Sequence, residues 1–136
     1  MFGATGRLLA GIIPVCLAAS AWAADEAVMN DTLKTIFARK SVRAYKQETV
    51  SKDRLELLVR AGMAAPTAVD KRPWEFIVVT DRAVLKQLAD ALPYAKMAER
   101  AAAVILVAGN VKKQWGGTES DYWIMDCSAA TQNILL

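Results

Sequence analysis

The chain has 136 residues, enough for one domain, and its 17 Lys and Arg against 14 Asp and Glu give a formal net charge of +3. Histidine is absent, which excludes a Ser-His-Asp triad, a Cys-His nucleophile pair and a histidine metal site, and two cysteines cannot complete a four-thiolate zinc site. The dispersed charge does not favour nucleic-acid binding. Any catalysis therefore depends on carboxylates, lysines, arginines, hydroxyls or a bound cofactor.

Residues 1–23 have the pattern of a secretory signal peptide. Arg7 supplies a positive charge, an apolar run follows it, and Ala21 and Ala23 are the small residues that a signal peptidase reads. We expect cleavage after Ala23, export to a bacterial periplasm, and a mature domain of residues 24–136.

Two other interpretations of this segment stay open. A membrane anchor needs about 20 uninterrupted apolar residues, whereas Gly11 and Pro14 interrupt the run, and a lipid anchor would use Cys16. Cleavage would remove the segment, so we predict no stable membrane span in the mature chain. It would also leave Cys127 as the only thiol, and the mature chain could not form a disulfide within itself.

Two amphipathic helices are predicted in the first half of the domain. Residues 31–38 place apolar side chains at helical spacing, with Asn30 or Asp31 available as the N-cap. A second helix is expected to begin after Ser51 and to continue until Pro66 forbids it.

Strands and helices alternate in the second half of the chain. The pattern predicts a strand over 74–79, a helix over 84–92, a short helix opening at Pro93, a buried strand over 103–107 that Gly109 ends, and a long helix over 119–136. Two strands do not make a stable sheet, and the last helix has no stop signal. We therefore expect a truncated sequence, with further strands missing or supplied by a partner.

The segment after the first helix, residues 39–45, reads Arg-Lys-Ser-Val-Arg-Ala-Tyr. In extended chain the side chains of Arg39, Ser41 and Arg43 would point to the same side. Two guanidinium groups and a hydroxyl suit a phosphate, because arginine offers paired, permanently charged donors. A solvated basic turn remains the other interpretation of this spacing.

Three segments, taken in order, resemble the nitroreductase family of FMN-dependent oxidoreductases. Residues 39–43 are similar to the family's Arg-x-Ser-x-Arg/Lys stretch, residues 61–74 to the segment that carries its Ala-Pro-Ser/Thr-x-x-Asn-x-Gln-Pro-Trp loop, and residues 126–136 to the start of its long central helix. The likeness runs over residues 33–136. It implies an α+β fold, a three-layer α-β-α sandwich with a mostly antiparallel sheet, which would be incomplete in this chain.

The resemblance assigns the basic stretch to FMN. It implies that Arg39 and Ser41, with Lys40 between them, bind the phosphate end of the cofactor, and that Arg43 lies near flavin N1 and the C2 carbonyl. A fixed cation at that edge would stabilise the reduced flavin, whose negative charge gathers there.

The same resemblance assigns a second group of residues to the cofactor. Pro66, Thr67 and Ala68 would come from the opposite subunit of a homodimer that binds FMN at its interface. Asp70 stands where the family usually has Asn, and a carboxylate cannot donate a hydrogen bond to the flavin. Arg72, in place of the usual Gln, could pair with Asp70 and neutralise it.

The implied activity is transfer of electrons from NAD(P)H to a small acceptor such as a nitro compound or a quinone, with no catalytic side chain assigned. A non-catalytic flavin-binding or degenerate relative is the alternative, and relatives that act on the flavin itself or on peptide-bound heterocycles show that other reactions are open. Trp115, Tyr122 and Trp123 could line a substrate pocket, although packing in the core or at an interface is the favoured explanation.

Polar residues interrupt the apolar pattern of the last helix. Asp126, Thr131, Gln132 and Asn133 predict buried hydrogen bonds or a dimer interface. Cys127 is expected to be an inert thiol whose pKa is raised by apolar neighbours.

Overall fold

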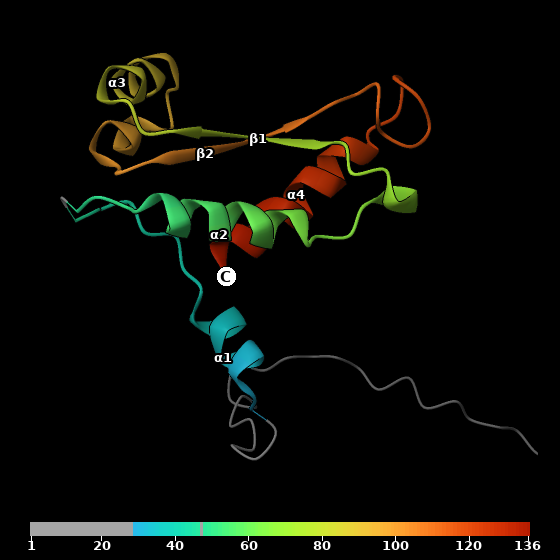
Figure 1. Cartoon of the computed structure of the whole chain (residues 1–136), viewed down its shortest axis with the longest axis horizontal. Helices are drawn as coiled ribbons and strands as arrows, with labels where there is room; N and C mark the ends of the chain where they lie inside the picture. Colours follow the sequence, from blue (N-terminus) through green and yellow to red (C-terminus); the bar gives the residue numbers. More distant parts are fainter. Residues whose placement is uncertain (1–28, 47) are drawn as a thin grey trace, which may run out of the picture.

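The computed structural model describes residues 29–46 and 48–136 (Figure 1). The elements in chain order are α1 (Asp31–Ala38), α2 (Lys52–Met63), the 3-10 turn η1 (Ala68–Asp70), β1 (Trp74–Val79), α3 (Arg82–Ala91), the 3-10 turn η2 (Lys96–Arg100), β2 (Val104–Gly109) and α4 (Tyr122–Leu135). The predicted signal peptide lies outside the described residues. No helix of the described part is long and apolar enough to cross a membrane.

The helices of the first half begin where their capping residues predict. The Asn30 side chain accepts a hydrogen bond from the Leu33 N–H at 2.9 Å, which identifies Asn30 as the cap of α1. The Ser51 hydroxyl accepts from the Arg54 N–H at 3.4 Å at the start of α2. In the second half, the Asp81 side chain accepts from the Ala83 and Val84 N–H groups, and α3 begins two residues before the predicted start at 84. Each cap satisfies an N–H that has no partner within its helix.

The two strands pair antiparallel, which agrees with the mostly antiparallel sheet that the family resemblance implies. Trp74 lies opposite Gly109 and Val79 lies opposite Val104, so β1 and β2 match along their full length. β2 therefore extends to Gly109, two residues beyond the predicted end of the strand at 107. Within residues 29–46 and 48–136 the sheet has these two strands alone.

The helices form two groups beside this strand pair. α2 and α4 contact each other on one side of it, and α4 also contacts both strands, whereas α3 packs against η2 (Figure 1). The buried residues are mostly small, and Leu85 and Pro73 are the largest described side chains that are fully buried. Much apolar surface stays outside this small core.

Two boundaries differ from the prediction for physical reasons. Pro93 lies in a turn, and the short helix is a 3-10 turn that begins at Lys96. Its end is held by the Arg82 guanidinium, which donates to the carbonyl oxygens of Glu99 and Ala101, both at 2.6 Å. A long-range contact of this kind fixes a backbone conformation that local sequence does not specify.

α4 begins at Tyr122, three residues later than predicted. The buried Gln114 side chain donates to the carbonyl oxygens of Gly117 and Ser120, both at 2.8 Å, and its own oxygen accepts from the Trp123 N–H at 3.1 Å. Gln114 therefore holds residues 117–120 in a loop and supplies an acceptor to the first turn of α4.

An apolar groove of about 920 Å³ runs between residues 42–46 and 48–50, α2, α3, η2, β2 and α4. Large apolar side chains are also exposed elsewhere, among them Leu57 of α2, 64% exposed, and Met125 of α4, 58% exposed. A large part of the apolar surface of the described chain is therefore exposed to solvent and not buried in its core.

Candidate functional site

The predicted phosphate-binding segment lies in extended chain directly after α1. Arg39 ends the helix with extended dihedral angles, φ −60° and ψ 127°. Val42 and Ala44 line the apolar groove, as does Tyr45 at the end of the segment, whereas Ser41 and Arg43 do not. Val42 and Ala44 follow the alternation of extended backbone, which would place Ser41 and Arg43 on the opposite side, whereas Tyr45 departs from it by lining the groove.

The cations of this segment are exposed and available to an anion. Arg39, Lys40 and Arg43 all lie on the surface, and none of them takes part in an ion pair with another described residue. Ser41, between Lys40 and Arg43 in the sequence, is also exposed. Three positive charges and a hydroxyl within five residues match the charge and the donor requirement of a phosphate group.

The second predicted group lies in the loop that follows α2. Val69, Asp70 and Arg72 have φ angles of 51°, 53° and 47°, so three residues that are not glycine adopt the left-handed region within this short loop. The Thr67 hydroxyl oxygen accepts a hydrogen bond from the Arg72 N–H at 3.0 Å and closes the loop. The Thr67 O–H proton stays available for donation.

Asp70 and Arg72 form the ion pair that the sequence suggests. Arg72 Nε lies 2.7 Å from Asp70 Oδ1 and Arg72 Nη2 lies 2.9 Å from Asp70 Oδ2, a two-pronged contact. The hydrogen bond from Arg72 holds the pKa of Asp70 below its ordinary value of 3.8, and the same contact raises the pKa of Arg72. A ligand near this loop therefore meets a neutralised pair instead of a bare carboxylate.

One chain does not bring the two predicted groups together. The basic segment leads toward the N-terminal end of α2, whereas the loop at 66–72 extends from its C-terminal end (Figure 1). α2 has 12 residues, which corresponds to a length of about 18 Å. A single ligand could contact both groups only if they came from different copies of the chain or if the chain rearranged.

A buried carboxylate of α4 contacts this loop. Asp126, 4% exposed, accepts a hydrogen bond from the Ala68 N–H at 2.9 Å through Oδ1. Its Oδ2 atom is buried and has no partner among the described residues. The polar pattern of the last helix predicts a buried hydrogen bond for Asp126 but not its partner in the loop, because the two are 58 residues apart.

The other polar residues of α4 divide between interior and surface. The Asn133 side chain donates to the Ala61 carbonyl oxygen at 3.1 Å, so the predicted buried hydrogen bonding is confirmed for Asn133 as it is for Asp126. Thr131 and Gln132 are exposed. Cys127 is buried, and burial, followed by the Asp126 charge, raises its pKa above the ordinary 9.0, as predicted.

The aromatic residues near α4 pack against their own chain. Trp115 and Tyr122 meet edge to face with ring centroids 4.8 Å apart. Trp123 covers the backbone of Gly109 so closely that a Cβ atom there would lie 2.9 Å from Trp123 Cδ2. Packing therefore accounts for these rings in the described chain.

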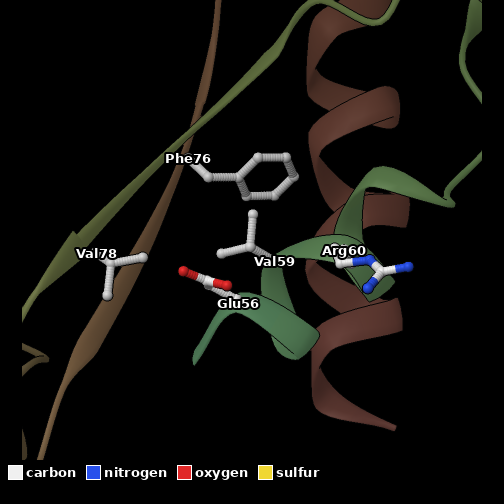
Figure 2. Close-up of a pocket in the computed structure, with 5 residues that line it drawn as sticks. All are labelled: Glu56, Val59, Arg60, Phe76 and Val78. Atoms are coloured by element: carbon white, nitrogen blue, oxygen red, sulfur yellow. The ribbon is translucent and has the colours of Figure 1, made fainter. Parts of the chain in front are cut away.

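A separate open pocket of about 350 Å³ lies between α2 and β1 (Figure 2). Val59, Phe76 and Val78 supply apolar surface, the Glu56 carboxylate extends toward Val78, and the Arg60 guanidinium points away (Figure 2). The pocket contains none of the predicted FMN-binding residues and offers no inward-facing cation for a phosphate.

Comparisons with a family model, with related sequences and with solved structures all indicate the same family. Residues 36–93 match the model of the Nitroreductase family. A protein of Archaeoglobus fulgidus, provisionally named NADH dehydrogenase/NAD(P)H nitroreductase, is 41% identical over 108 residues, which are 79% of this chain and 61% of that relative. A crystal structure of a protein with the same provisional name from Bacteroides thetaiotaomicron is 51% identical, with a TM-score of 0.72, over 79% of this chain and 60% of that chain. This chain belongs to the nitroreductase family.

The fold prediction is confirmed by these neighbours: the described helices and the antiparallel strand pair form part of the α+β nitroreductase fold. A provisionally named nitroreductase of Desulfovibrio desulfuricans, solved in complex with FMN, is 28% identical to this chain with a TM-score of 0.69. The match covers 79% of this chain and 61% of that protein. This chain spans about 60% of the length of the relatives named here.

The donor set of this chain is compatible with FMN. Arg39, Lys40 and Arg43 are exposed cations without partners among the described ion pairs, and Ser41 adds a hydroxyl. Asp70 departs from the usual amide, but its pairing with Arg72 removes the net negative charge. These residues therefore fit the phosphate end of FMN and do not repel its ring.

Proposed function

We propose that this protein is an FMN-dependent oxidoreductase that moves electrons from NAD(P)H to a small acceptor such as a nitro compound or a quinone. The observation that carries the proposal is the exposed segment 39–43, whose three cations have no ion-pair partner among the described residues. Support comes from the likeness to a protein solved with FMN and to relatives provisionally named for NAD(P)H.

The protein side chains would bind FMN and adjust its reduction potential, while bound FMN would supply the two-electron chemistry. Arg39, Lys40 and Ser41 hold the phosphate end, where paired guanidinium donors and a hydroxyl match its oxygens. Arg43 places a permanent charge beside the flavin edge that becomes negative on reduction, and so favours the reduced form. None of these roles requires a histidine.

The proposal includes a homodimer in which Pro66, Thr67 and Ala68 of one copy approach the basic segment of the other. Two observations support it: the separation of these groups within one chain (Figure 1) and the apolar side chains beside the basic segment. Ile36 is 43% exposed and Val42 is 53% exposed. Contact with a second copy would remove this surface from water.

We also propose that residues 1–23 direct export to the periplasm. The support is the sequence alone, with its charged start, apolar run and small residues before position 24. An exported enzyme of this type would need an electron donor outside the cytoplasm.

An FMN titration followed by flavin fluorescence tests the cofactor proposal. Arg39→Ala should raise the FMN dissociation constant by about 10- to 100-fold, the range expected for a charge-assisted contact. Lys34→Ala is the matched control, because it removes one exposed positive charge of α1 that pairs with Asp31 at 3.4 Å outside the segment. Equal dissociation constants for both variants would refute the assignment.

Bleaching of the bound flavin by NADPH under anaerobic conditions tests turnover. Loss of the yellow absorbance, followed by its return on addition of a quinone, is the expected result. A flavin that stays oxidised with both NADH and NADPH would instead support the non-catalytic flavin-binding alternative.

A further inference from the structure

The loop between α2 and β1 holds an unfavourable backbone conformation. Val69, Asp70 and Arg72 all have positive φ angles near 50°, and Val69 carries a β-branched side chain that is poorly accommodated there. A conformation of this kind persists only where surrounding contacts fix it. The contacts that fix the loop therefore decide where its residues lie.

Most of these contacts lie within the loop itself. The Arg72 N–H donates to the Thr67 hydroxyl oxygen at 3.0 Å, the Asp70 N–H donates to the Thr67 carbonyl oxygen at 3.1 Å, and Asp70 pairs with Arg72. They shape the loop but do not attach it to the rest of the molecule. Among hydrogen bonds between described residues, only that from the Ala68 N–H to Asp126 Oδ1 joins residues 66–72 to another element.

The buried Asp126 carboxylate is not explained by a contribution to the stability of the fold. It is 4% exposed, its neighbours Cys127 and Ala130 are also buried, and its Oδ2 atom has no partner among the described residues. A buried carboxylate oxygen without a partner destabilises a fold, whereas an apolar side chain in that position would not. What the carboxylate does provide is a fixed acceptor for the loop.

We propose that Asp126 is a positioning residue that holds the loop of residues 66–72 in its left-handed conformation and thereby sets the affinity for FMN. The second half of this inference rests on the proposed function, because it takes Pro66, Thr67 and Ala68 to face the cofactor. Asp126 itself acts through the Ala68 backbone and touches no cofactor atom.

Two variants of the full chain separate this role from general stability. Asp126→Ala removes the acceptor, whereas Asp126→Asn keeps one side-chain oxygen that can accept from the Ala68 N–H. Asn133→Ala is the matched control on the same helix, since it breaks the bond from α4 to the Ala61 carbonyl oxygen and leaves the loop contact in place. Amide hydrogen exchange of residues 67–72 and the FMN dissociation constant are measured for each.

In Asp126→Ala we expect loop exchange without FMN to be about tenfold faster and FMN binding about tenfold weaker, the ratio that one ordinary hydrogen bond supplies. Asp126→Asn should restore both values to near wild type, and Asn133→Ala should leave both unchanged. Unchanged loop exchange in Asp126→Ala, or equal loosening of the loop by Asn133→Ala, would overturn the inference.

The two readouts also separate this inference from the proposed function. A loop that loosens in Asp126→Ala while the FMN dissociation constant stays the same would overturn the link between Asp126 and the cofactor and leave the FMN proposal standing. A wild-type chain that binds no FMN would refute the proposed function together with that link. Loop exchange would then decide the attachment of the loop by itself.

Discussion

Replacing Gly62 by Ala tests how closely α2 packs against the rest of the molecule. In an exposed helix this change raises the free energy of unfolding by about 0.8–1 kcal/mol. In α2 the new Cβ atom would lie 2.8 Å from Phe76 Cε1 and 3.0 Å from Ile134 Cδ1, both shorter than ordinary contacts. Overpacking of this kind typically costs about 1–3 kcal/mol. We therefore expect a net decrease of about 1 kcal/mol in the free energy of unfolding.

Urea denaturation followed by tryptophan fluorescence and far-UV circular dichroism measures the change. Ile134→Val removes the Cδ1 atom that the new methyl group meets, so it should offset part of the loss in the Gly62→Ala background. A double-mutant cycle should give a favourable coupling of at least about 0.5 kcal/mol between the two changes. An increase in the free energy of unfolding on Gly62→Ala would show that the space beside α2 is larger than the structure indicates and would refute the reasoning.

Four further expectations concern the site, the thiol and the N-terminus. Arg43→Ala should lower the reduction potential of bound FMN, measured by dye equilibration, because a cation that favours the reduced form is lost; an unchanged potential would contradict its role. The carboxyl carbon of Asp70 should titrate below pH 3.8 in an NMR experiment and move up toward that value in Arg72→Ala, so the pair is ionised at neutral pH and lost only as acid protonates the carboxylate. Cys127 should react with iodoacetamide more slowly than a free thiol at pH 8, because its pKa lies above 9.0; a rate equal to that of free cysteine would contradict its burial. Intact mass of the exported protein should show cleavage after Ala23, whereas a retained N-terminus in the membrane fraction would identify an anchor.

Local signals predicted the elements that depend on local contacts. Asn30 and Ser51 cap their helices through N–H groups three residues away, and the aromatic and β-branched residues of β1 favour extended chain. The start of α4 was wrong by three residues because Gln114 holds the preceding loop through side-chain hydrogen bonds. The hydrophobic pattern of the sequence does not predict these side-chain hydrogen bonds.

In the candidate site, too, the features set by neighbouring residues were predictable and those set by distant contacts were not. Alternation along extended chain predicted that Ser41 and Arg43 share a side, and complementary charges two residues apart predicted the pair of Asp70 with Arg72. The left-handed conformation of Val69 was not foreseeable, since a β-branched residue argues against it. Its attachment through Asp126 depends on a contact between distant parts of the chain.

The pairing of β1 with β2 has a consequence for handling the protein. In the described part of the chain each strand has a neighbour on one side only, so its other side leaves backbone N–H and C=O groups ready to join a further strand. Residues 74–79 and 104–109 contain neither proline nor lysine, and Glu75 is their only charged residue. These borders lack the features by which natural sheets discourage strand addition. A polypeptide limited to the described residues should therefore be prone to edge-to-edge association at high concentration, and a charged substitution such as Ile77→Lys, at a site 53% exposed, is expected to suppress it.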